Sequence, residues 1–243
     1  MSAAGGLLYG VGVGPGDPEL LTLKAARIID SADVVAYFAK AGRRSHARAV
    51  VAARLGRQQE LALAYPVTTE IDRLDAAYRA AIAAFYAEAA AAIAALLDAG
   101  KNVAVLSEGD PLFYGSYMHI HCRLADRYRT EVIPGVTGMS GCWSGAGVPI
   151  AQGDDVMLVL PGTLAQADLA ARLASAEAAV VMKLGRNLAK VRRALAEAGR
   201  LERALYVERA TTDTARSMKL TEKSDDTAPY FSIVLVPGWE GER

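Results

Sequence analysis

The sequence contains little cysteine and no excess of charge of either sign. Of its 243 residues only Cys122 and Cys142 are cysteines, which is too few for a disulfide framework. The 27 basic and 27 acidic side chains cancel, whereas proteins that bind nucleic acid need positive charge to neutralise phosphates. These shortages argue against a disulfide-stabilised secreted domain and against a nucleic-acid partner.

Long hydrophobic runs and an N-terminal leader pattern are also missing. The longest nearly continuous apolar stretch, Ala89 to Leu97, is about half the length that a membrane span needs. The opening MSAAGG has neither the basic segment nor the apolar segment of a signal peptide. We therefore expect a cytoplasmic protein without a membrane partner.

Apolar residues are abundant and make up 52% of the sequence. A chain of this length can bury one large core or two smaller ones, and it is too apolar to be disordered. The expected class is a globular protein that binds small molecules or transforms them.

Strand and helix patterns alternate along the chain, which is typical of α/β domains with parallel strands. Two such domains are expected, at residues 1–146 and 147–243, joined through a segment rich in glycine and serine. Strands are predicted at 7–13, 32–37, 103–106, 131–133, 156–160, 180–183, 204–208 and 231–236, with a charged hairpin within 211–229. Helices are predicted at 22–30, 45–55, 71–97, 116–127, 165–174 and 188–198.

Three loops rich in glycine follow predicted strands: GPGDP at 14–18, SEGDP at 107–111 and PGVTGM at 134–139. The first loop does not fit the dinucleotide pattern G-x-G-x-x-G, because Pro15 or Asp17 occupies the sixth position. Each loop alone could be an ordinary turn, with Asp110 as a cap. Ligands of open α/β sheets bind at the carboxyl ends of strands, so three such loops together indicate a binding site.

These segments carry a resemblance to a known family. GVGPGDPELLTLKAA, ADVV, SEGDPLFYGS and VIPGVTGMSG, followed by MKLG and YVERATT, resemble the tetrapyrrole (corrin and porphyrin) methyltransferases over nearly the whole chain. The resemblance implies the class III methyltransferase fold. In it, two α/β domains hold S-adenosylmethionine in the cleft between them and release S-adenosylhomocysteine. SEGDPLFYGS, GVTGMSGCW, KLGRN and ERATT are most similar to members that methylate carbon 20 of precorrin-2 in cobalamin biosynthesis.

The resemblance also implies the residues that contact the cofactor. They are Pro15, Glu108, Gly109, Asp110, Phe113, Ser116, Thr137 and Gly138 in the first half, and Met182, Ala210 and Ser232 in the second. The family often has glycine where Glu108 stands, so only the backbone of Glu108 carries over. No metal ion is expected, since His119 and His121 point about 200° apart on a helix.

A tetrapyrrole substrate bears several carboxylates, so basic side chains are expected to bind it. The densest basic cluster, after the second strand, and one residue beside a later motif are the candidates: Lys40, Arg43, Arg44, Arg48 and Arg186. A solvated surface is the alternative interpretation of the cluster. Tyr114 and Tyr117 are candidates for lining the site, and the catalytic base stays unknown.

Other functions remain open at this stage. Within the family, the substrate could be cobalt-precorrin-2 or another tetrapyrrole. Outside catalysis, a module that only binds tetrapyrrole or cofactor would show tight binding without turnover. The resemblance further implies a homodimer, and hand-over of an oxidation-prone product to the next enzyme of the pathway is expected.

Overall fold

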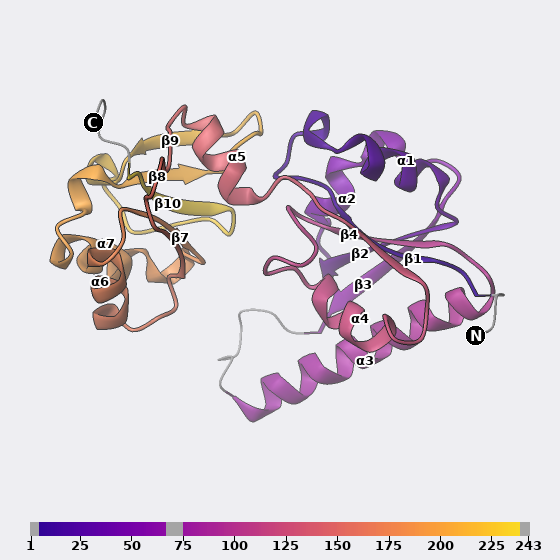
Figure 1. Cartoon of the computed structure of the whole chain (residues 1–243). Helices are drawn as coiled ribbons and strands as arrows, with labels where there is room; N and C mark the ends of the chain where they lie inside the picture. Colours follow the sequence, from indigo (N-terminus) through magenta and orange to yellow (C-terminus); the bar gives the residue numbers. More distant parts are fainter. Residues whose placement is uncertain (1–4, 67–74, 239–243) are drawn as a thin grey trace. The chain divides into compact units, whose positions relative to one another are not determined.

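The structure is a computed structural model that describes residues 5–66 and 75–238, and the chain divides into two compact units between Thr137 and Gly138 (Figure 1). Each unit is built on one five-stranded sheet covered by helices, as the prediction of two α/β domains requires. The division precedes the expected boundary after residue 146. The intervening helix, α5 (Gly138–Gly145), groups with the second unit because Cys142 packs in one core with Val180 and Val207.

In the first unit all strand pairs are parallel and the order is β3-β2-β4-β1-β5. The strands are β1 (Leu8–Gly12), β2 (Val34–Lys40), β3 (Gln59–Tyr65), β4 (Val103–Ser107) and β5 (Thr130–Ile133). Sequence patterns did not predict β3, an edge strand that buries only Leu63 fully. Because every strand runs the same way, all five carboxyl ends lie along one edge.

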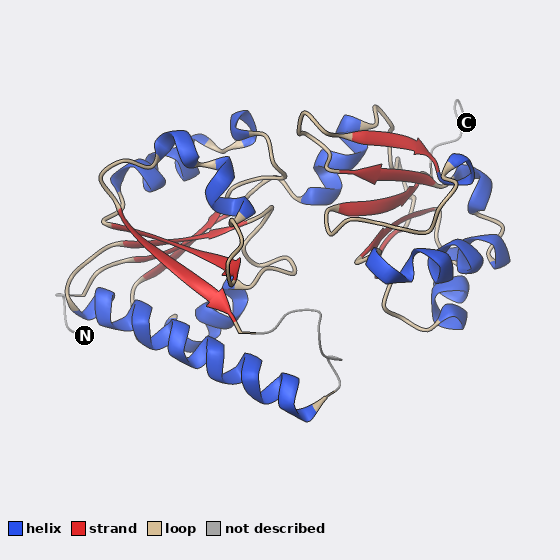
Figure 2. Ribbon diagram, turned by 180° about the vertical axis from the view of Figure 1, so that it is seen from behind, coloured by secondary structure: helices blue, strands red, loops and turns tan. Residues whose placement is uncertain are grey.

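Helices cover both faces of this sheet. On one face α1 (Leu23–Ser31) starts at the Thr22 cap, whose hydroxyl accepts the N–H of Ala25, and α2 (His46–Val50) starts at the Ser45 cap. On the other face lie α3 (Ala76–Asp98) and α4 (Tyr117–Leu124). Figure 2 shows the long helix α3 running beside the first sheet. The predicted start of this helix at 71–74 lies outside the described residues.

Helix α3 is longer and more evenly apolar than the stretch from Ala89 to Leu97 suggested. It is the one helix of the described residues long and apolar enough to cross a membrane, by length and composition. Helices that cover a sheet within a folded core pass the same test. Phe85, Ile93 and Leu97 of α3 are buried in one hydrophobic core with residues of the first sheet.

The second unit has a mixed sheet of order β6-β7-β10-β8-β9. Its strands are β6 (Met157–Pro161), β7 (Ala178–Met182), β8 (Leu205–Glu208), β9 (Arg216–Lys219) and β10 (Ser232–Val236). Strand β10 is antiparallel to β7 and to β8. Helices α6 (Gln166–Ala174) and α7 (Leu188–Glu197) cover one face, and α5 covers the other.

The charged segment 211–229 does not form a hairpin within itself. It supplies one strand, β9, which pairs antiparallel with β8 and extends the sheet. Short 3-10 turns complete the fold at Pro18–Leu20, Ala52–Arg54, Gly185–Asn187, Leu201–Arg203 and Leu220–Glu222.

Gly10 in the middle of β1 makes room for a core side chain. A Cβ atom on Gly10 would lie 2.3 Å from Cε1 of Tyr117, a fully buried residue of α4. The missing side chain therefore lets α4 lie close to the sheet.

We predict that Gly10→Ala lowers the free energy of unfolding by about 1–3 kcal/mol, because the Tyr117 ring has no free volume to move into. Urea denaturation measures this. Gly56→Ala is the matched control, since a Cβ at Gly56 meets nothing within 4 Å. Equal unfolding free energies for the two variants would contradict the predicted clash.

Candidate functional site

The three glycine-rich loops meet at the carboxyl edge of the first sheet. The N–H of Gly109 donates to the carbonyl oxygen of Gly14 at 2.8 Å, which bridges the first and second loops. A Cβ on Gly135, in the third loop, would lie 2.1 Å from the carbonyl oxygen of Gly109. The loops can approach this closely only because no side chain intervenes.

Asp110 ties the second loop to the third. Its Oδ1 accepts the N–H of Leu112 at 2.9 Å and so closes a turn, as the capping interpretation predicts. Its Oδ2 accepts the N–H of Gly135 at 3.2 Å. The carboxylate therefore fixes the position of one loop on another, and both its oxygens have backbone donors.

Glu108 links the second loop to the basic segment after β2. The residue is exposed, and its Oε1 accepts the N–H of Ala47, the second residue of α2, at 3.2 Å. The segment between β2 and α2 carries Arg43 and Arg44, which are both exposed. Glu108 thus brings the expected cofactor loop and the expected substrate-binding segment together.

Beneath these loops lies an unsatisfied hydroxyl. Ser107 ends the central strand β4, and within the described residues its Oγ is the buried side-chain polar atom that has no hydrogen-bond partner. A buried polar group without a partner destabilises the fold, so its presence at this edge is a mark of a functional position. Sequence patterns did not single out this side chain.

The second unit gathers its expected contact residues at one edge of its own sheet. Met182 ends β7 and Ser232 begins the antiparallel strand β10, opposite Glu208 at the end of β8. Ala210 follows in the next turn, where the N–H of Arg209 donates to the carbonyl oxygen of Phe231 at 2.9 Å. Chain direction and register therefore place Met182, Ala210 and Ser232 close together.

Backbone strain is concentrated in the loops that carry the family motifs. The non-glycine residues of the described chain with positive φ are Tyr114 (56°), Lys183 (58°), Arg209 (49°) and Thr211 (65°). L-residues seldom adopt such angles, and they persist where surrounding structure enforces them, often at functional sites. All four belong to the motifs SEGDPLFYGS, MKLG and YVERATT.

The two tyrosine candidates have different surroundings. Tyr114 is 49% exposed and lies beside Phe113, with ring centroids 4.9 Å apart, so it stays a candidate for lining the site. Tyr117 is completely buried, its hydroxyl lies 3.3 Å from Nδ1 of His121, and burial raises its pKa. This placement does not support Tyr117 as a site residue, because its ring is packed in the core beside Gly10.

Other predicted residues occupy separate positions. Pro15 is half-buried in the first loop, Thr137 ends the first unit, and Gly138 begins α5 with open space where a Cβ would stand. The hydroxyl of Ser116 is hydrogen-bonded to that of Tyr65 at the end of β3. Because β3 was not predicted, no sequence signal pointed to this partnership.

Among the basic candidates, Arg48 is already paired. Its Nε and Nη2 bind both carboxylate oxygens of Glu60, each at 2.8 Å, and the pair lowers the pKa of Glu60. Arg48 therefore braces α2 against β3 and is not available to a ligand without losing that pair. Arg43, Arg44 and Arg186 are exposed, and Lys40 is half-buried.

Metal-binding side chains are not gathered in the part of the chain that the structure describes, where no group of three His, Cys, Asp or Glu residues could hold an ion. The ring of His119 stacks on Tyr86 with centroids 4.0 Å apart, and burial lowers its pKa. Burial raises the pKa of the Cys142 thiol to about 12, so this side chain is a packing residue.

Comparison with known proteins identifies the family of this chain. The sequence model of the Tetrapyrrole (Corrin/Porphyrin) Methylases matches residues 7–224. A Sinorhizobium precorrin-2 C(20)-methyltransferase is 64% identical over 242 residues, which is 99% of each chain. A Salmonella typhimurium cobalt-precorrin-2 C(20)-methyltransferase is 34% identical and aligns over 97% of this chain and 98% of that protein.

A solved structure of similar fold is also found. Uroporphyrin-III C-methyl transferase from Thermus thermophilus, in complex with S-adenyl homocysteine, superposes with a TM-score of 0.66 and 26% identity. The superposition covers 95% of this chain and 97% of that one. The chain belongs to the tetrapyrrole (corrin/porphyrin) methylase family.

Proposed function

We propose that the protein transfers a methyl group from S-adenosylmethionine to carbon 20 of precorrin-2 and so forms precorrin-3A in cobalamin biosynthesis. The observation that carries this proposal is the 64% identity, over 99% of both chains, to a protein of that name. Similarity to the cobalt-precorrin-2 enzyme is lower, at 34%, which favours the metal-free substrate.

The residues present fit the cofactor. The unsatisfied Ser107 hydroxyl offers a hydrogen bond to a ligand, and the position at Gly138 leaves open space for one. We propose that the contacts come from Pro15, Glu108, Gly109, Asp110, Phe113, Ser116, Thr137, Gly138, Met182, Ala210 and Ser232. For Glu108 the contact is through the backbone, because its side chain is engaged with Ala47.

The bound cofactor supplies a methyl group that its sulfonium already activates. Methyl transfer to C20 would leave S-adenosylhomocysteine with the electron pair of the broken carbon–sulfur bond, and the C20 proton would pass to water. The protein mainly has to align the two carbons, and such orientation can supply roughly 7–11 kcal/mol of the barrier. The rigid ties between the loops serve this purpose, and Tyr114 lines the site beside them.

The substrate's carboxylates would bind to Lys40, Arg43, Arg44 and Arg186. Guanidinium groups suit this role because they bind carboxylates in a bidentate manner. Arg48 is left out because Glu60 occupies it. The homodimer stays a prediction from the family resemblance. The cytoplasmic location stays a prediction from the sequence composition, and the hand-over of product stays one from the oxidation-prone chemistry of the product.

The decisive experiment is anaerobic incubation of the purified protein with precorrin-2 and methyl-labelled S-adenosylmethionine, with the product read by mass and carbon NMR. We expect one added methyl group with its label at C20. Methylation at another carbon would overturn the specific reaction. Tight cofactor binding without transfer to precorrin-2 or to cobalt-precorrin-2 would instead identify a binding module.

We predict that the double variant Arg43→Ala, Arg44→Ala raises the KM for precorrin-2 roughly tenfold or more, because two charge-assisted contacts are lost. The affinity for S-adenosylmethionine should not change. Arg129→Ala is the control: this exposed arginine precedes β5 and so lies at the opposite edge of the same sheet. A KM equal to that of the control would show that the cluster is only a solvated surface.

We also predict that Asp110→Ala weakens S-adenosylmethionine binding roughly tenfold, because the second and third loops lose their tie at Gly135. Isothermal titration calorimetry measures the Kd. Asp75→Ala removes a comparable bond, 2.7 Å to the N–H of Ala77 at the start of α3, and should leave the Kd unchanged. Equal effects of the two substitutions would refute a specific role for Asp110.

A further inference from the structure

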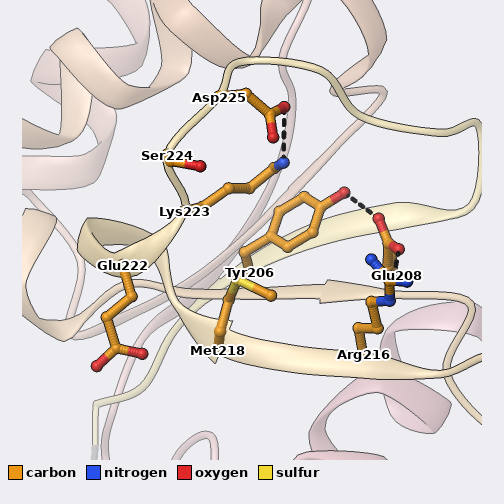
Figure 3. A pocket seen from close by; sticks show the side chains of 8 residues that line it. All are labelled: Tyr206, Glu208, Arg216, Met218, Glu222, Lys223, Ser224 and Asp225. Atoms are coloured by element: carbon orange, nitrogen blue, oxygen red, sulfur yellow. Dashed lines mark hydrogen bonds and ion pairs between the residues drawn. The ribbon is translucent and has the colours of Figure 1, made fainter.

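A small cavity in the second unit lies beside the strand that leads to Ala210. Its volume is about 160 Å³, and its walls come from β8, β9 and the segment that follows β9. Figure 3 shows the side chains that line it: Tyr206, Glu208, Arg216, Met218, Glu222, Lys223, Ser224 and Asp225.

Tyr206 and Glu208 form a buried hydrogen bond on one face of β8 (Figure 3). Tyr206 is 1% exposed and Glu208 is 8% exposed, and the tyrosine hydroxyl donates to Oε2 of Glu208 at 2.6 Å. Burial, and then the bond to Glu208, raises the pKa of Tyr206, so the hydroxyl stays a donor at neutral pH. A buried carboxylate needs such a partner, because burial without one is costly.

The tyrosine ring is held in turn by Lys223. The Nζ of Lys223 lies 4.9 Å from the ring centroid and pairs with Oδ1 of Asp225 at 3.0 Å. The backbone of this segment is fixed to α7, since Arg192 donates to the carbonyl oxygens of Leu220 at 2.7 Å and of Lys223 at 3.1 Å. The segment that packs on the Tyr206 ring is therefore itself hydrogen-bonded to α7.

Glu208 is the last residue of β8 and directly precedes the strained turn that begins at Arg209. In the sheet it lies opposite Ser232 on β10 and Arg216 on β9. The next residues include Arg209 and Thr211, with φ of 49° and 65°. Oε1 of Glu208 lies 4.0 Å from Arg209 and 3.9 Å from Arg216, so it faces cations on both sides. Strained backbone of this kind persists only where neighbouring groups hold it.

We propose that Tyr206 and Glu208 are positioning residues that hold the turn Arg209–Thr212 in the conformation that binds S-adenosylmethionine. Neither side chain touches the cofactor; both act through Ala210 and its neighbours. The inference rests on the proposed function, because it is the cofactor that the turn is expected to contact.

The test uses Tyr206→Phe, which keeps the ring below Lys223 and removes the hydroxyl that donates to Glu208 and also hydrogen-bonds with Ser232. We expect the Kd and the KM for S-adenosylmethionine to rise roughly tenfold, as one buried carboxylate loses its partner. The KM for precorrin-2, and kcat at saturating cofactor, should stay within about twofold of the wild-type values, a split that general destabilisation would not produce. The control is Tyr128→Phe, which breaks the 2.8 Å bond from Tyr128 to Asp98 in the first unit.

A second pair of variants keeps the test decisive if Tyr206→Phe does not fold. Glu208→Gln keeps an oxygen that accepts from Tyr206 and should retain cofactor affinity within about threefold, whereas Glu208→Ala should lose roughly tenfold. Equal affinities of these two variants would overturn the inference. So would wild-type affinity in Tyr206→Phe, or a parallel loss of precorrin-2 binding.

The two proposals fail differently. An active wild-type protein whose Tyr206→Phe variant binds the cofactor normally would remove the positioning role and leave the methyltransferase function standing. A wild-type protein that binds no S-adenosylmethionine in calorimetry would remove both.

Discussion

The parallel direction of the five strands in the first unit is the constraint on which its site depends. Since every strand ends at the same edge, segments far apart in sequence, such as those after Val11 and Ile133, emerge side by side. Their contact is then decided at atomic scale by Gly12 and Gly135, where an added Cβ would lie 2.6 Å and 2.1 Å from the carbonyl oxygen of Gly109. Asp110 converts this contact into a fixed geometry by accepting from both loops.

The second unit reaches a comparable result with a different sheet. The ends of β7 and β8 lie at the same edge as the beginning of β10, because β10 runs antiparallel to both. The segments there meet because of this antiparallel pairing and not because all strands run in one direction. The turns there contain residues such as Lys183 and Thr211 in the left-handed region. Such turns need support from outside themselves, which is why the buried Tyr206–Glu208 bond matters for the loop that follows it.

The features that short stretches of sequence determine could be predicted from the sequence. Strand β1, the Thr22 cap and the three glycine loops carry strong signals in consecutive residues, and the structure has each of them. Strand β3 was not predicted because an edge strand buries few side chains. The contact between Tyr65 and Ser116 and the pair of Glu60 with Arg48, which both depend on β3, were therefore not predicted either. These contacts depend on which strands become neighbours, which no single segment reveals.

The same reasoning bears on the zero net charge. Asp110 and Glu108 in the first unit and Glu208 in the second accept hydrogen bonds from the protein's own backbone or side chains. They act as internal ties of the fold. Of the basic side chains, Arg48 is neutralised by Glu60, whereas Arg43 and Arg44 project from the exposed segment beside Glu108. A neutral chain can thus present local positive charge to a substrate rich in carboxylates, because these acidic groups are engaged within the fold.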